Sequence, residues 1–518
     1  MHKRKRLLMM LGCLVLCTGC FNSERDNLQD PYNTPILRIL EATYEQDRGA
    51  VMLRWEYLGR ETVQQFRVFR KVGTESGFRV VAGIEREDAS GGESGTAFFR
   101  DTELVAGEVI QYSVSADGVG GGLAGSDPVP VRVAGAKMSH LGLDYAAGAV
   151  RVFWDANAEG AAAYEVVRSS EENPGEVVYR TEDVRETSWI DSGLRGDLTY
   201  TYVIRTVMAN GVRMDSRPDH ARLYELLGDV VLEDLTQAGG RICLFDIAEY
   251  GVLPHGVFVW RQGEEGVEAV RLLVNTRIHT QQGKAIIESG PVDIGTLAPS
   301  SLSAIGPSPQ QGQMGAIKMH LTGIDVAAGQ AVLNAYGNAP SPIFTTSWPV
   351  GGASARTAAC WNDDGLLLVA AGGRLWAFSG LQEAGSVVIE GEPGDLLYMQ
   401  QVSSTQSACV WAALPDEGRM LRGELGLAGG RLASVTWHEV ALPAGARPVA
   451  LMAYTYDQVF ALDAGNRQML VFDALGRQLL HWPVPLQDAE HGDMATNSYW
   501  WDLIHVLDGN GRLLSYGP

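Results

Sequence analysis

Apolar and polar residues alternate in short runs along most of the chain, and glycine, asparagine, aspartate and proline separate these runs. Val51-Met52-Leu53-Arg54-Trp55 and Val150-Arg151-Val152-Phe153-Trp154 are typical examples. Alternation with a period of two predicts half-buried β-strands, and the residues between the runs predict tight turns. Glycine accounts for 61 of the 518 residues, more than the ~7 % of an average protein. The pattern therefore predicts an all-β protein rich in hairpins.

Residues 35–133 and 136–224 repeat one order of features. The shared markers are a tryptophan that ends one strand, an aromatic residue that begins the next, and an aspartate eleven residues before a tyrosine: Trp55, Phe66, Asp101 and Tyr112, then Trp154, Tyr164, Asp191 and Tyr202. This order resembles fibronectin type III modules. The resemblance implies two seven-stranded sandwiches, each with its tryptophan at the centre. It also implies that Tyr112 and Tyr202 form tyrosine corners, whose hydroxyl groups cap backbone upstream, and that the modules have neither a disulfide nor catalytic machinery.

The second of these segments contains the tripeptide Arg195-Gly196-Asp197. In animal matrix proteins this tripeptide can bind integrins from the loop between the last two strands of such a module. Here it precedes the corner tyrosine, where glycine and aspartate are favourable turn residues. We interpret it as a turn.

Residues 225–518 repeat with a shorter period. A glycine-containing turn, then a basic residue or glutamine, then an apolar strand recur seven times, marked by Arg241, Lys284, Gln330, Arg374, Arg419, Arg467 and Arg512. A period of 40–50 residues with hairpins is typical of a β-propeller with four strands per blade. We expect seven blades, with six or eight left open. A strand near residues 229–232 would complete the last blade and close the ring, which removes exposed sheet edges.

Residues 459–483 resemble an NHL-type blade. The resemblance is carried by Val459-Phe460-Ala461-Leu462-Asp463-Ala464-Gly465-Asn466-Arg467 and by the run Leu470 to Arg477. We find the aspartate and asparagine of this pattern in one blade only, so the resemblance covers a single blade and leaves the propeller subfamily open.

The start of the chain has the features of an export signal. A basic segment, residues 2–6, precedes an apolar segment, Leu7 to Leu16, which is too short to cross ~30 Å of hydrocarbon. Leu16-Cys17-Thr18-Gly19-Cys20 resembles a bacterial lipobox, with Cys17 where leucine is usual. The resemblance implies cleavage before Cys20 and acylation of Cys20, whose two or three acyl chains would anchor the protein stably.

This interpretation divides the chain into a signal peptide (1–19), a lipidated tether (20–34), two sandwiches (35–133 and 136–224) and a propeller (225–518). It predicts a lipid-anchored protein of the cell envelope, in the outer membrane if the cell is Gram-negative. Phe21 follows the lipid cysteine, where an aspartate would favour retention in the inner membrane of enteric bacteria. Which side of the outer membrane the protein would face stays open.

Charge and residue chemistry narrow the function further. Acidic residues outnumber basic ones 62 to 41, for a net charge of −21, and loss of the signal, which has four bases and no acid, makes it −25. A polyanion such as nucleic acid is therefore excluded as a partner. We find no motif for catalysis, metal or cofactor binding in its required context. We expect Cys243, Cys360 and Cys409 to be buried free thiols, with a disulfide between blades left open.

Two groups of residues are candidates for binding. Asp488, His491 and Asp493 lie in a loop between blades, where carboxylates and imidazole could contact a ligand. Trp500 and Trp501 are neighbours, so a strand would direct one ring into the core and the other outward, where aromatic rings stack on sugars or fill partner pockets.

Together these features predict a membrane-anchored, non-catalytic binding or scaffold protein. Its two sandwiches would form a stalk, and its propeller head would recognise a protein or a glycan. Two alternatives stay open: a propeller enzyme of the lyase, lactonase or glycosidase type on a stalk, and a scaffold for envelope assembly. The absence of a catalytic motif favours a protein that is not an enzyme.

Overall fold

The computed structural model describes residues 36–517, apart from residues 60, 86–95, 158, 232–241, 247–255, 264–265, 280–283, 291–295, 298–303, 308–318, 326–328, 337–341, 351–356, 362–365, 380–381, 400–407, 455–457 and 498–502. The elements in these ranges are all strands, as the alternating pattern predicts. Within the same ranges no helix has the length and apolar character needed to cross a membrane.

The first sandwich packs a three-stranded sheet on a larger sheet. The first sheet has the order β1 (Leu37–Glu45), β2 (Ala50–Tyr57), β5 (Thr96–Asp101). The second has the order β4 (Arg79–Glu85), β3 (Gln65–Val72), β6 (Val109–Gly118), β7 (Gly121–Gly125), with β8 (Val129–Arg132) also beside β6. Trp55 is 0 % exposed between the two sheets, so it occupies the predicted central position.

The second sandwich repeats this topology. Its smaller sheet has the order β13 (Ser188–Asp191), β10 (Ala149–Asp155), β9 (Lys137–Asp144). Its larger sheet has the order β12 (Glu176–Thr181), β11 (Ala161–Ser169), β14 (Tyr200–Met208), β15 (Arg213–Asp215), with β16 (Asp219–Ala221) also beside β14. The last strand is split into two pieces in both modules, and Trp154 is buried like Trp55. These strand orders are those of fibronectin-type sandwiches.

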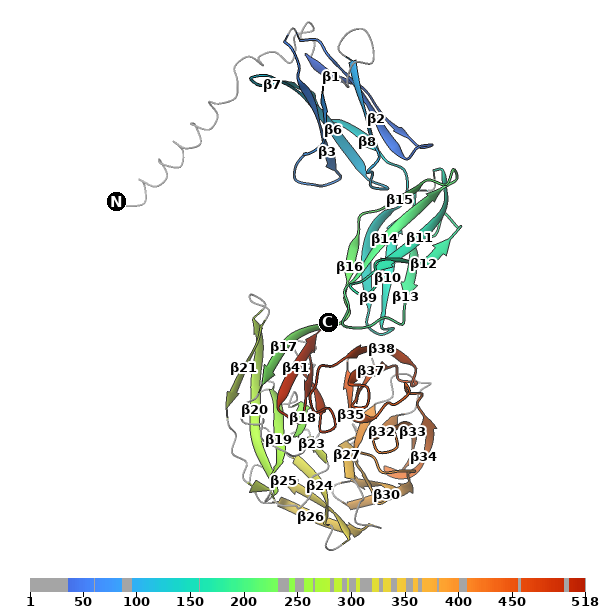
Figure 1. Ribbon diagram of the computed structural model, residues 1–518. Helices are drawn as coiled ribbons and strands as arrows, with labels where there is room; N and C mark the ends of the chain where they lie inside the picture. Colours follow the sequence, from blue (N-terminus) through green and yellow to red (C-terminus); the bar gives the residue numbers. More distant parts are fainter. Residues whose placement is uncertain are drawn as a thin grey trace, which may run out of the picture.

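The remaining strands form sheets around a ring, which we number blades I to VI in chain order (Figure 1). The strands of each blade follow in order from the innermost outward. Blade I contains β18 (Ile242–Asp246), β19 (Gly256–Gly263), β20 (Gly266–His279) and β21 (Lys284–Gly290), with β22 (Thr296–Leu297) beside β20. Blade II contains β23 (Ala304–Pro307), β24 (Met319–Asp325), β25 (Gln330–Tyr336) and β26 (Pro342–Pro349). Blade III contains β27 (Thr357–Trp361), β28 (Leu366–Ala371), β29 (Arg374–Ser379) and β30 (Gln382–Val388). Blade IV contains β31 (Asp395–Met399), β32 (Cys409–Leu414), β33 (Arg419–Ala428) and β34 (Arg431–Glu439). Blade V contains β35 (Pro448–Tyr454), β36 (Gln458–Asp463), β37 (Gln468–Phe472) and β38 (Gln478–Pro483). Blade VI contains β39 (Asp493–Asn497), β40 (Leu503–Leu507), β41 (Arg512–Gly517) and β17 (Glu225–Val231).

The ring closes through a strand from its own beginning. Strand β17 pairs antiparallel with β41 from Glu225 opposite Gly517 to Val231 opposite Arg512, which confirms the closing strand predicted near residues 229–232. The first and last parts of the propeller are thereby held in one sheet, in which β17 is the fourth strand of blade VI.

The described part of the chain contains six blades, a count that the sequence left open beside the favoured seven. Five of the seven markers lie at the turn between the second and third strands of a blade: Gln330, Arg374, Arg419, Arg467 and Arg512. Lys284 instead begins the fourth strand of blade I, and Arg241 lies outside the described residues. A turn residue marks every hairpin, whichever two strands it joins, so the period alone could not separate seven markers from six blades.

The second strands of blades III, IV and V read as continuous apolar runs, and every residue of β28, β32 and β36 is buried. Both faces of these strands pack against neighbouring blades, so the alternation seen in the sandwiches disappears.

Both sandwiches contain a bonded group of an arginine, an aspartate and a tyrosine, in which the aspartate and the tyrosine are buried. In the first, Arg70 Nη1 lies 2.8 and 2.7 Å from the two carboxylate oxygens of Asp101, and the Tyr112 hydroxyl donates to Asp101 Oδ2 at 2.7 Å. All three residues are at most 3 % exposed. Burial and the bond to Asp101 raise the pKa of Tyr112 far above its usual range.

The second sandwich repeats the group as Arg168, Asp191 and Tyr202, with 2.9 Å between the Tyr202 hydroxyl and Asp191 Oδ2. The resemblance implied that these tyrosine hydroxyls cap backbone, and for Tyr112 and Tyr202 that expectation is wrong. Each hydroxyl instead donates a hydrogen bond to the carboxylate of the aspartate eleven residues upstream. The backbone contact belongs to Tyr200, whose hydroxyl oxygen accepts the N–H of Arg195 at 2.9 Å.

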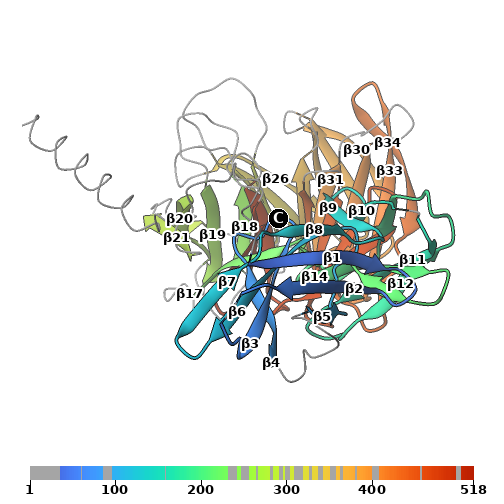
Figure 2. The ribbon, with the colours of Figure 1, turned by 90° about the horizontal axis from the view of Figure 1, so that it is seen from above.

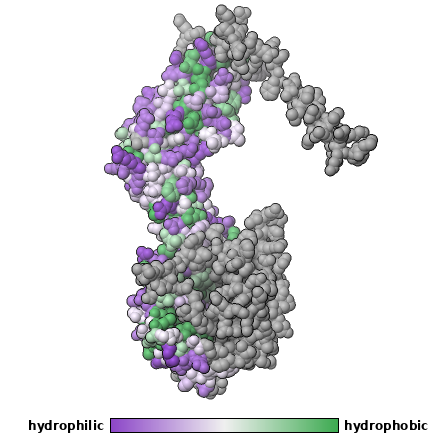
Figure 3. All heavy atoms as spheres, turned by 180° about the vertical axis from the view of Figure 1, so that it is seen from behind, coloured by the Kyte–Doolittle hydropathy of each residue, from purple (hydrophilic) through white to green (hydrophobic). Residues whose placement is uncertain are grey.

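The two sandwiches are joined end to end (Figure 1). Met208 and Met214 of the second belong to the core of the first, and Arg217 lies 3.5 Å from the carboxylate of Glu108. Seen from above, along the stalk, the sandwiches lie over the propeller (Figure 2). From behind, hydrophobic residues gather in a stripe on the first sandwich and on part of the head (Figure 3).

Candidate functional site

Two kinds of connection from every blade lie at one end of the propeller. Neighbouring strands run in opposite directions, so the turn from second to third strand and the loop from fourth strand to the next blade lie at the same end. We call this end the loop face. In blades IV to VI it includes turns 415–418, 464–467 and 508–511 and loops 440–447 and 484–492.

The loop that contains Asp488, His491 and Asp493 lies on this face. Asp488 Oδ2 is 2.8 Å from His491 Nδ1, and the backbone carbonyl of Asp488 accepts the N–H of Gly509 at 3.0 Å. Asp493 Oδ1 instead accepts the N–H of Met494 at 2.8 Å, at the start of β39. The structure thus brings Asp488 and His491 together and uses Asp493 locally. Trp500, Trp501 and Cys20 lie outside the described residues.

A chain of ion pairs crosses the loop face from blade IV to the loop before blade VI. Arg419 Nη1 lies 2.8 Å from Glu417 Oε2, and Arg419 Nη2 lies 3.1 Å from Glu439 Oε2. Arg447 pairs in the same way with Asp416 and Glu490. Because Asp416 and Glu417 are adjacent, the two groups are continuous, and four carboxylates share two guanidinium groups.

The sequence did not single out these residues, except for Arg419 as a repeat marker and Glu490 as a third carboxylate in the loop of Asp488 and His491. Asp416 and Glu417 stand two or three positions before that marker, which was the available signal. Their partners Glu439 and Arg447 come from other strands and loops, so only the fold brings the charges together.

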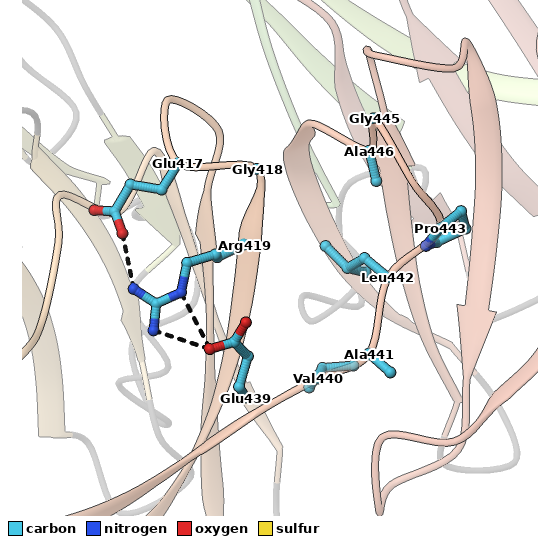
Figure 4. Close-up of a pocket in the computed structure, with 10 residues that line it drawn as sticks. All are labelled: Glu417, Gly418, Arg419, Glu439, Val440, Ala441, Leu442, Pro443, Gly445 and Ala446. Atoms are coloured by element: carbon cyan, nitrogen blue, oxygen red, sulfur yellow. Dashed lines mark hydrogen bonds and ion pairs between the residues drawn. The ribbon is translucent and has the colours of Figure 1, made fainter.

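A hollow of about 640 Å³ lies beside the ion pairs, between blades IV and V. Figure 4 shows Glu417, Arg419 and Glu439 on one side of it and the loop from Val440 to Ala446 on the other. One wall is therefore charged, while the other consists of backbone and small apolar side chains. Such a hollow can accept a ligand that combines polar groups with an aliphatic part.

Two buried carboxylates hold the turns of this face in place. Asp463 is 0 % exposed, and its Oδ1 accepts the N–H groups of Arg447, Gly465 and Asn466 at 2.7 to 3.2 Å. In blade VI, Asp508 Oδ1 accepts the N–H of Arg512 at 2.7 Å.

Asp508 does more than close its own turn. Its Oδ2 accepts the N–H of Gln487 from the preceding loop at 3.2 Å, as Asp463 accepts that of Arg447. The expectation that one blade alone carries the aspartate and asparagine is therefore wrong, because Asp508 and Asn510 provide them in blade VI at a shifted position.

The blades contain a buried thiol, Cys409, a half-buried thiol, Cys360, and a buried imidazole, His505. Cys360 and Cys409 are free thiols, and burial raises the pKa of both; the side chain of Cys243 is outside the described set. His505 is 1 % exposed with Nδ1 2.8 Å from Ser515 Oγ, and burial lowers its pKa to about 4. In the part of the chain described, no cluster of three or more His, Cys, Asp or Glu could hold a metal ion.

No known family model matches the chain, and no curated protein matches it. Among solved structures, it is similar to the β-propeller domain of Cps50 (Swd1) from Myceliophteria thermophila, with 13 % identity over 62 % of this chain and 93 % of that one, at a TM-score of 0.34. It is also similar to streptogramin B lyase, with 9 % identity over 57 % and 87 % of the two chains and a TM-score of 0.33. A third similarity is to the FN1–FN3 domains of chicken CNTN1, with 15 % identity over 36 % and 66 % of the chains and a TM-score of 0.16.

These similarities concern the fold alone. The strand orders themselves define the class: the chain is an all-β protein with fibronectin-type sandwiches and a β-propeller.

Proposed function

We propose that this protein is a lipid-anchored binding or scaffold protein of the cell envelope, whose loop face recognises a protein or a glycan without catalysing a reaction. The lipid would be carried by Cys20, and the outer membrane is the expected location in a Gram-negative cell. The observation that carries the proposal is the position of the stalk, which joins the head away from the loop face.

The contacts between stalk and head support this orientation. The second sandwich reaches β38 on the side of blade V, Gln458 at the start of β36, and the end of β41 near Tyr516. Gln458 and Tyr516 lie at strand ends opposite the loop face. The chain also enters the propeller from that opposite end, since β17 begins beside the end of β41.

The chemistry of the loop face supports binding. Glu417, Arg419 and Glu439 line a hollow with one aliphatic wall. Arg447, with two further carboxylates, continues the ion pairs beyond the hollow. Charged groups of this kind select a partner and accelerate its approach, and the aliphatic wall supplies area that leaves water on binding. Because the negative charge is in excess, the face would favour a partner that presents cationic or hydrogen-donating groups.

Matched substitutions on the two ends of the head test the proposal. Ala441 is exposed in the hollow, and Ala441→Arg would fill it with a bulky cation. Leu427 is 38 % exposed at the end of β33, beside the turn to β34 on the opposite end, so Leu427→Arg is the control. The full-length protein would be crosslinked in whole cells and also applied to a glycan array.

We expect Ala441→Arg to lose at least tenfold in partner recovery or glycan signal, while Leu427→Arg keeps the wild-type value. Equal binding by both variants would overturn the assignment of the loop face. Lipidation is tested separately by the mass of the N-terminal peptide of membrane-extracted protein: an unmodified Cys20 would refute the anchor and leave the binding result intact.

A further inference from the structure

The core of the second sandwich continues without a break into blades V and VI. Residues of both parts belong to one cluster of buried apolar side chains. Its centre is Tyr224, the last residue before β17, which is 0 % exposed. The Tyr224 ring stacks on Trp482 of blade V with centroids 5.1 Å apart, and it meets Phe460 and Tyr145 edge-on at 5.8 and 5.9 Å.

A buried amide links the same two parts. Gln458 of blade V is 0 % exposed, and its Oε1 accepts the Tyr224 hydroxyl at 3.2 Å. Its Nε2 donates to the backbone carbonyl of Tyr145 in the second sandwich. Both of these partners come from outside the propeller ring, so the two hydrogen bonds exist only while the sandwich and the head stay in contact.

The tripeptide Arg195-Gly196-Asp197 forms the edge of this contact. The N–H of Gly196 donates to the carbonyl of His481 at 3.2 Å, and the N–H of Tyr224 donates to the carbonyl of Gly196 at 2.8 Å. Arg195 and His481 form a parallel β-bridge on β38, the outermost strand of blade V. The tripeptide thus covers part of a sheet edge that would otherwise be open to another strand.

Gly196 fits only because it has no side chain. A Cβ atom at this position would lie 2.6 Å from a ring carbon of Trp482 and 3.3 Å from one of Tyr224. Both rings are buried, and neither can move aside without disturbing the core.

The charged residues of the tripeptide are also engaged within the molecule. Arg195 pairs with Asp197 at 2.8 Å and with Glu172 at 2.6 Å, while the Arg195 N–H donates to Tyr200. A receptor that reads Arg-Gly-Asp would need these two side chains extended and accessible.

We propose that the tripeptide is an internal docking element that makes the second sandwich an obligatory part of the propeller head. The second sandwich and the propeller then unfold as one cooperative unit, and the loop face keeps a fixed direction relative to the stalk. This device goes beyond the binding role, since it would operate whatever the head recognises.

Hydrogen exchange and calorimetry of the full-length protein test the proposal. Gly196→Ala places a methyl group against Trp482. Gly77→Ala is the control, because Gly77 has open space around its would-be Cβ and no positive φ. We expect Gly196→Ala to raise the exchange rate of the amides at Gly196 and Tyr224 by about tenfold or more, and to lower the melting temperature of the second sandwich and the head together. Gly77→Ala should leave both unchanged.

A second variant serves if Gly196→Ala does not fold, a result that would itself support the proposal when Gly77→Ala folds. Tyr224→Phe removes only the hydroxyl that binds Gln458, and we expect it to speed exchange of the amides at Gln458 and Tyr224. Two separate unfolding transitions in the wild type, one for the sandwich and one for the head, would overturn the proposal. So would exchange at Gly196 and Tyr224 as fast as in an exposed loop, or identical behaviour of Gly196→Ala and Gly77→Ala.

Discussion

The two arginine–aspartate–tyrosine groups permit a comparison within one chain, because they share the bonds from the arginine and the tyrosine to the aspartate but differ in the exposure of the arginine. The side chain of Arg70 is 2 % exposed and that of Asp101 is 4 % exposed. Arg168, the equivalent of Arg70, is 21 % exposed and also pairs with Glu176. Removing the aspartate should therefore destabilise the first sandwich more than the second.

Asp101→Ala would leave the buried Arg70 guanidinium with only the backbone carbonyl of Glu103 and the exposed Glu103 carboxylate, 3.5 Å away. It would also leave the Tyr112 hydroxyl without its acceptor. Loss of one partner of a buried ion pair destabilises by about 3–5 kcal/mol. Asp191→Ala would leave Arg168 partly solvated and still paired with Glu176, so a loss of about 1–2 kcal/mol is expected.

Native-state hydrogen exchange measures the two losses separately, which matters because a chain of several domains does not unfold in one step. The readout is the opening free energy of amides in β6 for Asp101→Ala and in β14 for Asp191→Ala. A loss of about 4 kcal/mol corresponds to nearly a thousandfold faster exchange in β6. Asp101→Asn, which keeps the shape and removes the charge, is the control and should lie between wild type and Asp101→Ala. Equal losses in the two sandwiches, or a larger loss for Asp191→Ala, would refute the argument from exposure.

Three further outcomes follow from the head. Burial lowers the pKa of His505 to about 4, from 6.5 in the unfolded chain, so the unfolded state binds more protons than the folded state between these pH values. The free energy of unfolding should therefore fall by roughly 3 kcal/mol as the pH drops from about 6.5 to about 4. Denaturant titrations at several pH values should show a smaller fall for His505→Gln. Burial raises the pKa of the Cys360 and Cys409 thiols, so both should react with a thiol reagent at pH 8 at least tenfold more slowly in the native protein than in denaturant, and equal rates would contradict their burial. Asp463→Ala should destabilise blade V by about 1–3 kcal/mol, because three backbone N–H groups lose their acceptor. A change below about 0.5 kcal/mol in the opening free energy of β36 and β37 amides would contradict this role.

Much of the fold could be predicted because its signals are local. A period of two sets which face of a strand is buried, and a tryptophan at the end of such a strand identifies the sandwich centre in both modules. The closing strand near residue 229 was also predictable, since a ring that lacks its last outer strand must take it from elsewhere.

The blade count and the hydrogen-bond partners of the tyrosines were harder to predict from the sequence. A glycine turn ends any hairpin, so a periodic turn counts hairpins of either kind, as Lys284 illustrates. The constant spacing from Asp101 to Tyr112 and from Asp191 to Tyr202 was visible in the sequence. The arginine that completes each group comes from an earlier strand, β3 in the first module and β11 in the second. Only the packed sandwich brings these three side chains into contact.

The candidate site shows the same division. Asp488 and His491 were close in sequence and are bonded to each other, but the ion pairs of Arg419 and Arg447 join residues of several loops. The proximity of these charged residues depends on how blades IV, V and VI are arranged around the ring.

The sequence by itself determined the all-β class, the sandwich pattern, the propeller and the turn at Arg195-Gly196-Asp197, because each depends on side chains within a few residues of one another. Only the tertiary structure decided that this turn lies against Trp482 and His481 and that Tyr224 fills the joint. The physical reason is that burial and pairing between distant segments depend on which surfaces meet, and no local pattern of polar and apolar residues records that choice.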